Sequence, residues 1–179
     1  MTTLRITAGT LRGRRLPVPP RDVRPTSERA RQAYFNIVGP RIQGARFLDL
    51  FAGTGAFSFE AVSRGAASAV AVDTSRKNIA AIEEHAKEWN VPVTAIAADV
   101  LALRHRAEVD LVYADPPYDF AQYPELLEAI ARLELTGDAL VAVEHRRRQE
   151  PFSTIPPQLL QERTAEYGEV WMTFFRRDR

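Results

Sequence analysis

The chain has 179 residues, enough to bury the core of one domain, whereas two independent domains would be cramped. It contains no cysteine, so disulfide bonds and thiolate metal sites are excluded. The formal net charge is only +1, and no apolar run approaches the roughly 18 residues that a membrane-spanning helix requires.

Positive charge is concentrated at the N-terminus. Residues 1–46 hold ten arginines against two acids, a net charge of +8, whereas residues 47–179 hold 14 basic and 21 acidic side chains, a net charge of −7. An arginine-rich segment punctuated by glycine and proline is typical of an arm that contacts phosphate groups, although a solvated basic face is the alternative. The candidate contacts are Arg5, Arg12, Arg14, Arg15, Arg21, Arg24 and, on the helix that follows, Arg29.

Within this arm, residues 4–7 and 11–16 are predicted to pair as a hairpin. A helix then begins at Pro25 and ends at Gly39-Pro40, because apolar residues recur at helical spacing between these points. Its apolar positions are Ala30, Ala33, Tyr34, Ile37 and Val38, and its opposite face carries Arg29, Arg31, Gln32 and Asn36. We assign residues 1–40 to a basic extension and residues 41–179 to the main domain.

Residues 46–55 are predicted to form a strand and a glycine turn, followed by a helix over about residues 56–64. Gly53 and Gly55 would let the backbone approach a ligand closely. The dinucleotide-binding pattern G-x-G-x-x-G would need a third glycine where this chain has Ser58, so NAD and FAD are disfavoured. S-adenosylmethionine has no pyrophosphate and tolerates the shorter pattern. The alternative is an ordinary strand-to-helix turn.

Acidic side chains end four successive apolar strands, which finish near residues 51, 73, 98 and 114. They are Asp49, Asp73, Asp99 and Asp115. Asp49 is placed to meet the ammonium group of S-adenosylmethionine, Asp73 to accept from ribose hydroxyls, and Asp99 to accept from an adenine amino group. Each acid alone could merely cap the following helix. Four in succession favour a shared cleft.

The last of these strands leads directly into the tetrapeptide D-P-P-Y at residues 115–118. Open α/β sheets bind ligands at the carboxyl ends of such strands. The Asp115 carboxylate and the Pro116 carbonyl could accept the two N–H hydrogens of an exocyclic amine on a nucleobase and draw out its conjugated lone pair. Tyr118 could stack on that base. The tetrapeptide therefore indicates methylation of a nucleobase amine, and the alternative is a proline-rich turn that closes a core strand.

The remaining elements complete an alternating pattern of strands and helices. Helices are predicted over about residues 75–89 and 121–133, and a fifth core strand over residues 139–144. Residues 158–167 and 169–175 are two strands without a helix between them, so they must pair antiparallel. The fold class is α/β: a Rossmann-like class I methyltransferase with a mostly parallel seven-stranded sheet, a C-terminal antiparallel hairpin and a small N-terminal extension.

Five motifs, in order along nearly the whole chain, resemble one family. They are T-A-G-T-L-R-G-R-R-L (7–16), R-P-T-S-E-R-A-R (24–31), L-D-L-F-A-G-T-G (48–55), E-A-V-S-R-G-A (60–66) and D-P-P-Y (115–118). This pattern is similar to that of the bacterial small-subunit ribosomal RNA guanine-N2 methyltransferases of the RsmD type. The resemblance implies methyl transfer from S-adenosylmethionine to the N2 amine of one guanine in 16S ribosomal RNA, either free or in an assembling small subunit.

The sequence thus predicts three groups of site residues. The candidate catalytic residues are Asp115, Pro116 and Tyr118; the candidate cofactor-binding residues are Asp49, Gly53, Thr54, Gly55, Asp73 and Asp99; and the candidate RNA-binding residues are Arg12, Arg14, Arg15, Arg24 and Arg29. We expect no metal, because His85, His105 and His145 are scattered without ligand spacing. We expect a cytoplasmic location, because the N-terminus lacks the apolar segment of a signal peptide and no run is long enough to span a membrane. We also expect a monomer.

Other functions remain open from the sequence. The same tetrapeptide serves adenine-N6 and cytosine-N4 methyltransferases that act on DNA, although this short chain has no separate target-recognition domain. A non-catalytic nucleic-acid-binding module on a vestigial nucleotide fold is a second alternative. An NAD-dependent oxidoreductase is a third, disfavoured by Ser58 and by the terminal hairpin. Pyrimidine C5 methylation is excluded, because that reaction needs a cysteine thiolate.

Overall fold

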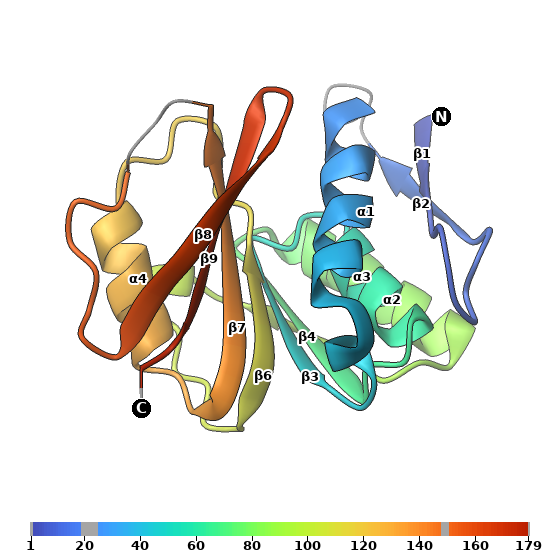
Figure 1. Cartoon of the computed structure of the whole chain (residues 1–179). Helices are drawn as coiled ribbons and strands as arrows, with labels where there is room; N and C mark the ends of the chain where they lie inside the picture. The colour runs from blue at the N-terminus through green and yellow to red at the C-terminus, as the bar shows by residue number, and fades with distance from the viewer. Residues whose placement is uncertain (1, 19–24, 148–150, 179) are drawn as a thin grey trace.

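A seven-stranded sheet lies at the centre of the computed structural model, which describes residues 2–18, 25–147 and 151–178 (Figure 1). Its strands are β3 (Arg46–Leu50), β4 (Ser68–Asp73), β5 (Val93–Ala97), β6 (Val109–Ala114), β7 (Leu135–Arg146), β8 (Leu159–Tyr167) and β9 (Val170–Arg177). They lie in the order β5-β4-β3-β6-β7-β9-β8. The strands from β5 to β7 are parallel, and β9 pairs antiparallel with β7 and β8. The predicted mostly parallel sheet with a C-terminal antiparallel hairpin is confirmed.

Helices cover both faces of this sheet. They are α1 (Pro25–Val38), α2 (Ala56–Ser63) and α3 (Arg76–Trp89) on one face, and α4 (Tyr123–Ala131) on the other. Side chains alternate along β6, so Leu111 and Tyr113 join the hydrophobic cluster under α1 to α3, while Val112 and Ala114 join the cluster under α4. The continuous apolar run of β6 is therefore the pattern of a strand buried on both faces.

The N-terminal hairpin consists of β1 (Thr2–Arg5) and β2 (Arg15–Val18), which pair antiparallel. A hairpin was predicted, but its strands were placed too close to the turn. Residues 6–14 instead form a long connection that packs against the C-terminal end of α2. Gly9 approaches that end so closely that a Cβ atom there would stand 1.7 Å from the Ser63 carbonyl oxygen. The Thr10 amide also donates to the Ser63 carbonyl at 2.9 Å.

A buried carboxylate on α2 joins the hairpin and α1 to the main domain. Glu60 accepts from the Thr7 amide at 2.9 Å, from the Thr7 hydroxyl at 2.6 Å and from the Ala8 amide at 3.1 Å. It also pairs with the Arg64 guanidinium at 2.9 Å and the Arg31 guanidinium at 3.6 Å. Arg31 is only 1% exposed, so its predicted place on the polar face of α1 is wrong. The acid on α2 provides the counter-charge that makes this burial possible.

The hairpin and α1 share one core with the sheet. Ile6 and Leu16 belong to the same hydrophobic cluster as Phe47 and Tyr113 of the sheet, and Tyr34 of α1 packs edge-on against both aromatic rings. The described parts of the extension, residues 2–18 and 25–40, are therefore packed as an added layer on the main domain. The helix ends at Val38, as the Gly39-Pro40 pair predicted, and a 3₁₀ turn follows.

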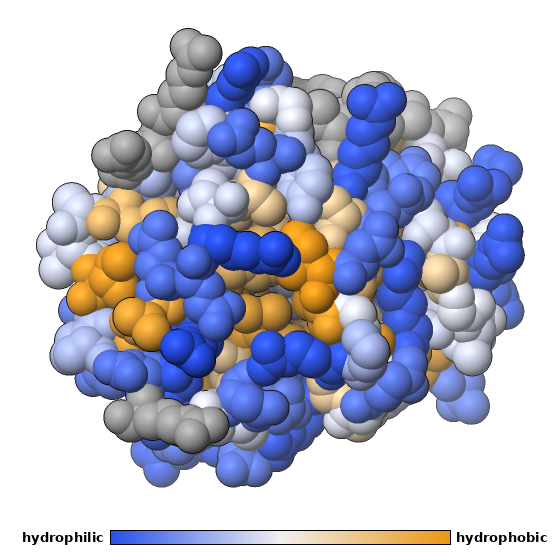
Figure 2. All heavy atoms as spheres, in the orientation of Figure 1, coloured by the Kyte–Doolittle hydropathy of each residue, from blue (hydrophilic) through white to orange (hydrophobic). Residues whose placement is uncertain are grey.

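The surface of this face is mainly hydrophilic, with apolar side chains showing in the middle, between α1 and the β8–β9 hairpin (Figure 2). The layer formed by α1 thus leaves part of the sheet face uncovered by a helix. No helix in the described ranges is both long and apolar enough to cross a membrane.

Candidate active site

The loops that follow β3, β4 and β6 meet at the carboxyl edge of the sheet. The amide of Ala52, after β3, donates to the carbonyl of Val72 on β4 at 2.9 Å, and the Asp115 amide donates to the carbonyl of Leu50 at 3.3 Å. These bonds bring the glycine loop, the end of β4 and the start of the D-P-P-Y segment together. Asp115 is exposed at this edge and Pro116 is buried.

The two glycines of the loop after β3 have different roles. Both have positive φ angles, 55° at Gly53 and 74° at Gly55. A Cβ atom at Gly55 would stand 2.9 Å from the Ile82 side chain, so a glycine there lets α2 pack against α3. A Cβ atom at Gly53 would meet no described atom within 4 Å. Gly53 therefore faces open space where a ligand can approach the backbone.

Asp73 fixes this loop from the end of β4. One carboxylate oxygen accepts from the Gly53 amide at 2.8 Å, and the other accepts from the Ser75 amide at 2.8 Å and from the Asn78 amide group at 3.4 Å. A carboxylate offers about four acceptor positions, so it can still accept from ligand hydroxyl groups. The side chain is half-buried beside the open space at Gly53, which fits a ribose-binding role.

Asp49 lies beneath the loop and is only 2% exposed. One of its oxygens accepts from the Ser58 amide at 3.0 Å and from the Ser58 hydroxyl at 2.7 Å. Burial, with a smaller contribution from the charges of Asp115 and Asp73, raises the pKa of the Asp49 carboxyl to about 7, although the Ser58 hydrogen bonds act in the opposite direction. Ser58 is thus the partner that orients this carboxylate. In the sequence it was noted only because it stands where the dinucleotide-binding pattern has a third glycine.

Asp99, after β5, is exposed and accepts from the Leu101 amide at 2.9 Å. It therefore caps the short 3₁₀ helix of residues 100–102, the capping role that we considered for each acid separately. The capping bond occupies one acceptor position of the carboxylate and leaves others open. The contact of Asp99 with adenine stays a prediction. Thr54 lies half-buried between the two glycines.

Two aromatic residues flank Asp115 along the chain. Tyr113 is buried, stacks on Phe57 with ring centroids 3.6 Å apart, and donates a hydrogen bond to the buried Glu144 of β7. Burial, followed by the charge of Glu144, raises the pKa of Tyr113 well above its usual value. The sequence did not predict the contacts of Tyr113 with Phe57 and Glu144, because these residues are far apart along the chain.

Tyr118 is the other aromatic residue, and it is 63% exposed. The guanidinium carbon of Arg146 lies 3.2 Å from the centroid of its ring. Sequence reasoning missed Arg146. The available signal was the arginine run at residues 146–148, which begins where the fifth core strand ends; residue 148 lies outside the described part of the chain.

Of the predicted RNA-binding arginines, Arg12 and Arg14 do not lie at this edge. Arg12 and Arg14 lie in the connection docked on the far end of α2, and the Arg14 guanidinium lies 5.6 Å from the ring of Trp89, the last residue of α3. Because α2 and α3 run away from the carboxyl edge, the connection that carries these two residues lies toward the opposite edge (Figure 1). Arg15 on β2 and Arg29 on α1 are exposed. Arg24 lies outside the described residues.

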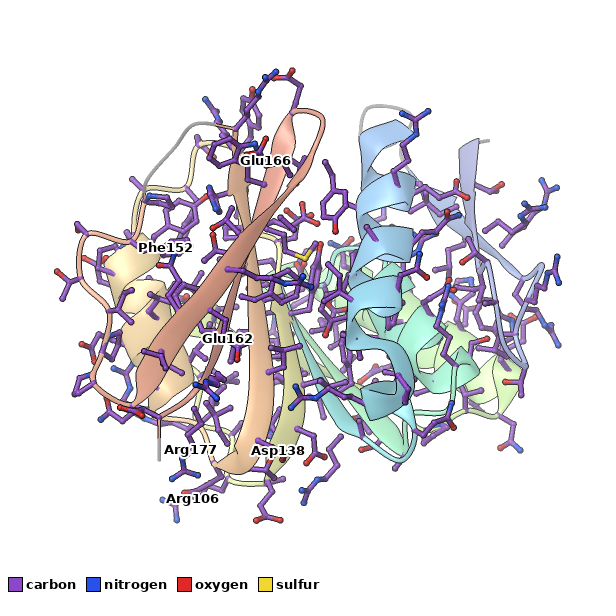
Figure 3. All side chains as sticks on the ribbon, in the orientation of Figure 1. Arg106, Asp138, Phe152, Glu162, Glu166 and Arg177 are labelled. Atoms are coloured by element: carbon purple, nitrogen blue, oxygen red, sulfur yellow. The ribbon has the colours of Figure 1, made fainter. Side chains whose placement is uncertain are left out.

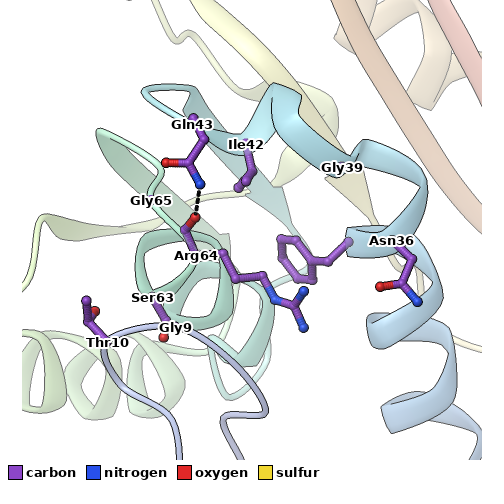
Figure 4. Close-up of a pocket in the computed structure, with 10 residues that line it drawn as sticks. Gly9, Thr10, Asn36, Gly39, Ile42, Gln43, Ser63, Arg64 and Gly65 are labelled. Atoms are coloured by element: carbon purple, nitrogen blue, oxygen red, sulfur yellow. Dashed lines mark hydrogen bonds between the residues drawn. The ribbon is translucent and has the colours of Figure 1, made fainter.

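A pocket of about 950 Å³ opens at that opposite side, between the hairpin connection, the end of α1 and the end of α2 (Figure 4). Arg64 extends into it and lies 5.0 Å from the Phe35 ring. None of the predicted catalytic or cofactor-binding residues lines this pocket. We therefore do not assign this pocket as the active site. We place the candidate active site at the carboxyl edge, where the predicted catalytic and cofactor-binding residues lie.

Comparison with known proteins gives consistent results. The family model described as conserved hypothetical protein 95 matches residues 4–176. The chain is 33% identical to ribosomal RNA small subunit methyltransferase D of Escherichia coli K12, over 98% of this chain and 90% of that protein. A solved Escherichia coli structure, yhhF, superposes with a TM-score of 0.85 at 29% identity and 99% coverage of both chains.

The fold extends to more distant enzymes. N-methyltransferase NodS of Bradyrhizobium japonicum, solved in complex with S-adenosyl-L-homocysteine, superposes with a TM-score of 0.72 at 13% identity, covering 90% of this chain and 92% of that one. At that identity the likeness shows a shared fold. The architecture is that of the class I methyltransferases, as the sequence predicted.

Proposed function

Because this chain belongs to the family described as conserved hypothetical protein 95, we propose that it transfers a methyl group from S-adenosylmethionine to the N2 amine of a specific guanine in 16S ribosomal RNA. We propose that it acts as a monomer in the cytoplasm, on free ribosomal RNA or on an assembling small subunit. The relative named ribosomal RNA small subunit methyltransferase D supports the substrate class, and the D-P-P-Y segment supports an amine as the acceptor.

One observation carries this proposal: Gly53 follows β3, which lies between β4, ending at Asp73, and β6, which leads into Asp115. Two strand spacings, about 10 Å, therefore separate the carboxyl ends of β4 and β6. A cofactor held at Asp73 and over Gly53 would reach toward an amine held at Asp115. Proximity of this kind supplies much of the rate of a direct transfer.

S-adenosylmethionine supplies an electrophilic methyl group on sulfur. When this cofactor is bound, Asp73 would accept from its ribose hydroxyls, Asp49 would provide a carboxylate for its ammonium group and Asp99 would accept from its adenine amino group. The Asp115 carboxylate and the Pro116 carbonyl accept the two N–H hydrogens of guanine N2 while Tyr118 stacks on the base. The cofactor would supply its methyl carbon to the N2 lone pair, and the carbon–sulfur bond would break as the new carbon–nitrogen bond forms. The nitrogen then loses one proton to Asp115 or to water, which leaves a neutral methylated amine.

The basic extension would hold the rest of the RNA. We propose that residues 1–40 contact phosphates through Arg12, Arg14, Arg15, Arg24 and Arg29. The distance of the hairpin from the carboxyl edge suits a large folded RNA, which can lie across both. The shared core keeps the two contact regions at a fixed separation.

Calorimetry and a transfer assay test the proposal. Titration with S-adenosylmethionine should release or absorb heat with one-to-one stoichiometry, and labelled cofactor should pass its methyl group to unmodified small-subunit ribosomal RNA. Absence of binding heat would instead support a non-catalytic nucleic-acid-binding module on a vestigial fold. Binding without transfer to any RNA would refute the proposed substrate.

A further inference from the structure

Arg146 lies at the end of a paired strand, whereas Tyr118 lies in a loop. Arg146 is the last residue of β7 and is paired with Val170 of β9, so its backbone is fixed by the sheet. Tyr118 lies in the loop between β6 and α4, where the Phe120 amide donates to the Pro117 carbonyl across a turn. A contact between the two side chains therefore joins a loop residue to the sheet.

That contact is close and face-on. The guanidinium carbon of Arg146 lies 3.2 Å from the centroid of the Tyr118 ring, although the tyrosine is 63% exposed. A flat cation over a ring face is attracted by the negative charge of the π system, and this attraction limits where the ring can move. Burial raises the pKa of Tyr123 at the start of α4 to about 12, and the positive charge of Arg146 acts against that rise. The guanidinium is therefore near enough to affect Tyr123 as well as Tyr118.

We propose that Arg146 is a positioning residue that holds the Tyr118 ring in place as the stacking surface for the target base; this inference rests on the proposed function. Its positive charge also draws π-electron density toward the face it covers. Stacking of an electron-rich purine on the ring becomes more favourable as a result, and guanine is such a purine. Arg146 therefore contributes to the choice of base through Tyr118 and not by touching the base itself.

A direct phosphate contact is the competing role for an exposed arginine at this place. The two roles differ in their dependence on Tyr118 and on salt. A positioning residue loses its effect when the tyrosine ring is absent, whereas a phosphate contact keeps its effect. Loss of one phosphate contact also reduces the slope of log affinity against log salt by about 0.7 to 0.9.

A double-mutant cycle separates them. The variants are Arg146→Met, which keeps the length of the side chain without its charge, Tyr118→Ala, and the two combined; Arg146→Lys restores the charge. The matched control is Arg147→Met, because Arg147 is the neighbouring arginine and pairs with Glu169 at 3.7 Å. We expect Arg146→Met to lower kcat about tenfold with unchanged cofactor affinity and salt slope, and Arg146→Lys to recover part of the loss. The double variant should be no slower than Tyr118→Ala alone.

Amide hydrogen exchange of residues 118–122 adds a readout that does not depend on activity. Exchange should be faster in Arg146→Met than in the wild type and unchanged in Arg147→Met. Three results would each overturn the proposal. They are a loss of kcat in the double variant equal to the product of the two single losses, a reduced salt slope in Arg146→Met, and equal exchange rates in the two arginine variants. If the wild type transfers no methyl group to RNA, the proposed function fails, while the exchange measurement still decides whether Arg146 holds the loop.

Discussion

At the scale of single residues, Asp115 is central to the proposed chemistry. Replacement by alanine removes the acceptor that draws out the amine lone pair, so we expect kcat to fall by about 100-fold or more. Cofactor affinity, measured by calorimetry, should stay within about twofold because Asp49 and Asp73 are intact. Asp119→Ala is the matched control, an exposed carboxylate in the same loop. Equal activity of the two variants would show that Asp115 has no catalytic role.

The second residue-scale prediction concerns the buried carboxyl of Asp49. Its pKa of about 7 in the folded protein lies above the ordinary value of about 3.9 in an unfolded chain. Between these values the folded protein retains a proton that the unfolded chain has lost. The free energy of unfolding therefore decreases as the pH rises from about 4 to about 7, by up to about 4 kcal/mol from this group, and is constant above that range.

Urea denaturation at several pH values measures this effect. Asp49→Asn cannot lose a proton, so its free energy of unfolding should decrease less than that of the wild type across the same interval. Asp138→Asn, which changes an exposed carboxylate, should follow the wild type. Parallel curves for the wild type and Asp49→Asn would contradict the raised pKa.

At the scale of elements, Glu60 connects the hairpin, α1 and α2. In Glu60→Gln the buried Arg31 and the largely buried Arg64 lose their counter-charge, so we expect a loss of about 3 kcal/mol in the free energy of unfolding. Glu108→Gln removes the charge of an exposed pair with Arg46 and should cost at most about 1 kcal/mol. Faster hydrogen exchange confined to residues 2–18 should accompany the Glu60 change. Equal losses in the two variants would argue against the role of Glu60.

The same elements show what the sequence could predict. Strands, helices and the glycine loop follow from local periodicity and turn residues, and four strand-end acids are predicted to converge because parallel strands end at one edge. The buried pair of Glu60 and Arg31 could not be assigned, because charged side chains are rarely buried and these two residues lie more than 25 positions apart in the chain. The contact of Arg146 with Tyr118 was missed for the same reason: it joins two segments that only the folded sheet brings together.

At the scale of the whole molecule, charge is separated between the N-terminal extension and the rest. Reversing Arg12 and Arg14 to glutamate should weaken RNA binding about tenfold or more and reduce the slope of log affinity against log salt by roughly 1.4 to 1.8. Arg104→Glu with Arg106→Glu is the matched control, since these exposed residues have the same spacing and Arg106 lies at the lower edge of the sheet (Figure 3). Filter-binding titrations over a range of salt concentrations measure both slopes. Equal effects of the two pairs would mean that net charge alone matters.

We propose that the carboxyl edge of this sheet methylates a guanine amine in small-subunit ribosomal RNA. The most direct test incubates the protein and labelled S-adenosylmethionine with unmodified ribosomal RNA, assembled small subunits and DNA, and then identifies the labelled nucleoside by mass spectrometry. We predict N2-methylguanosine at a single position of 16S ribosomal RNA. Label in N6-methyladenosine, in N4-methylcytidine or in DNA alone would contradict the account.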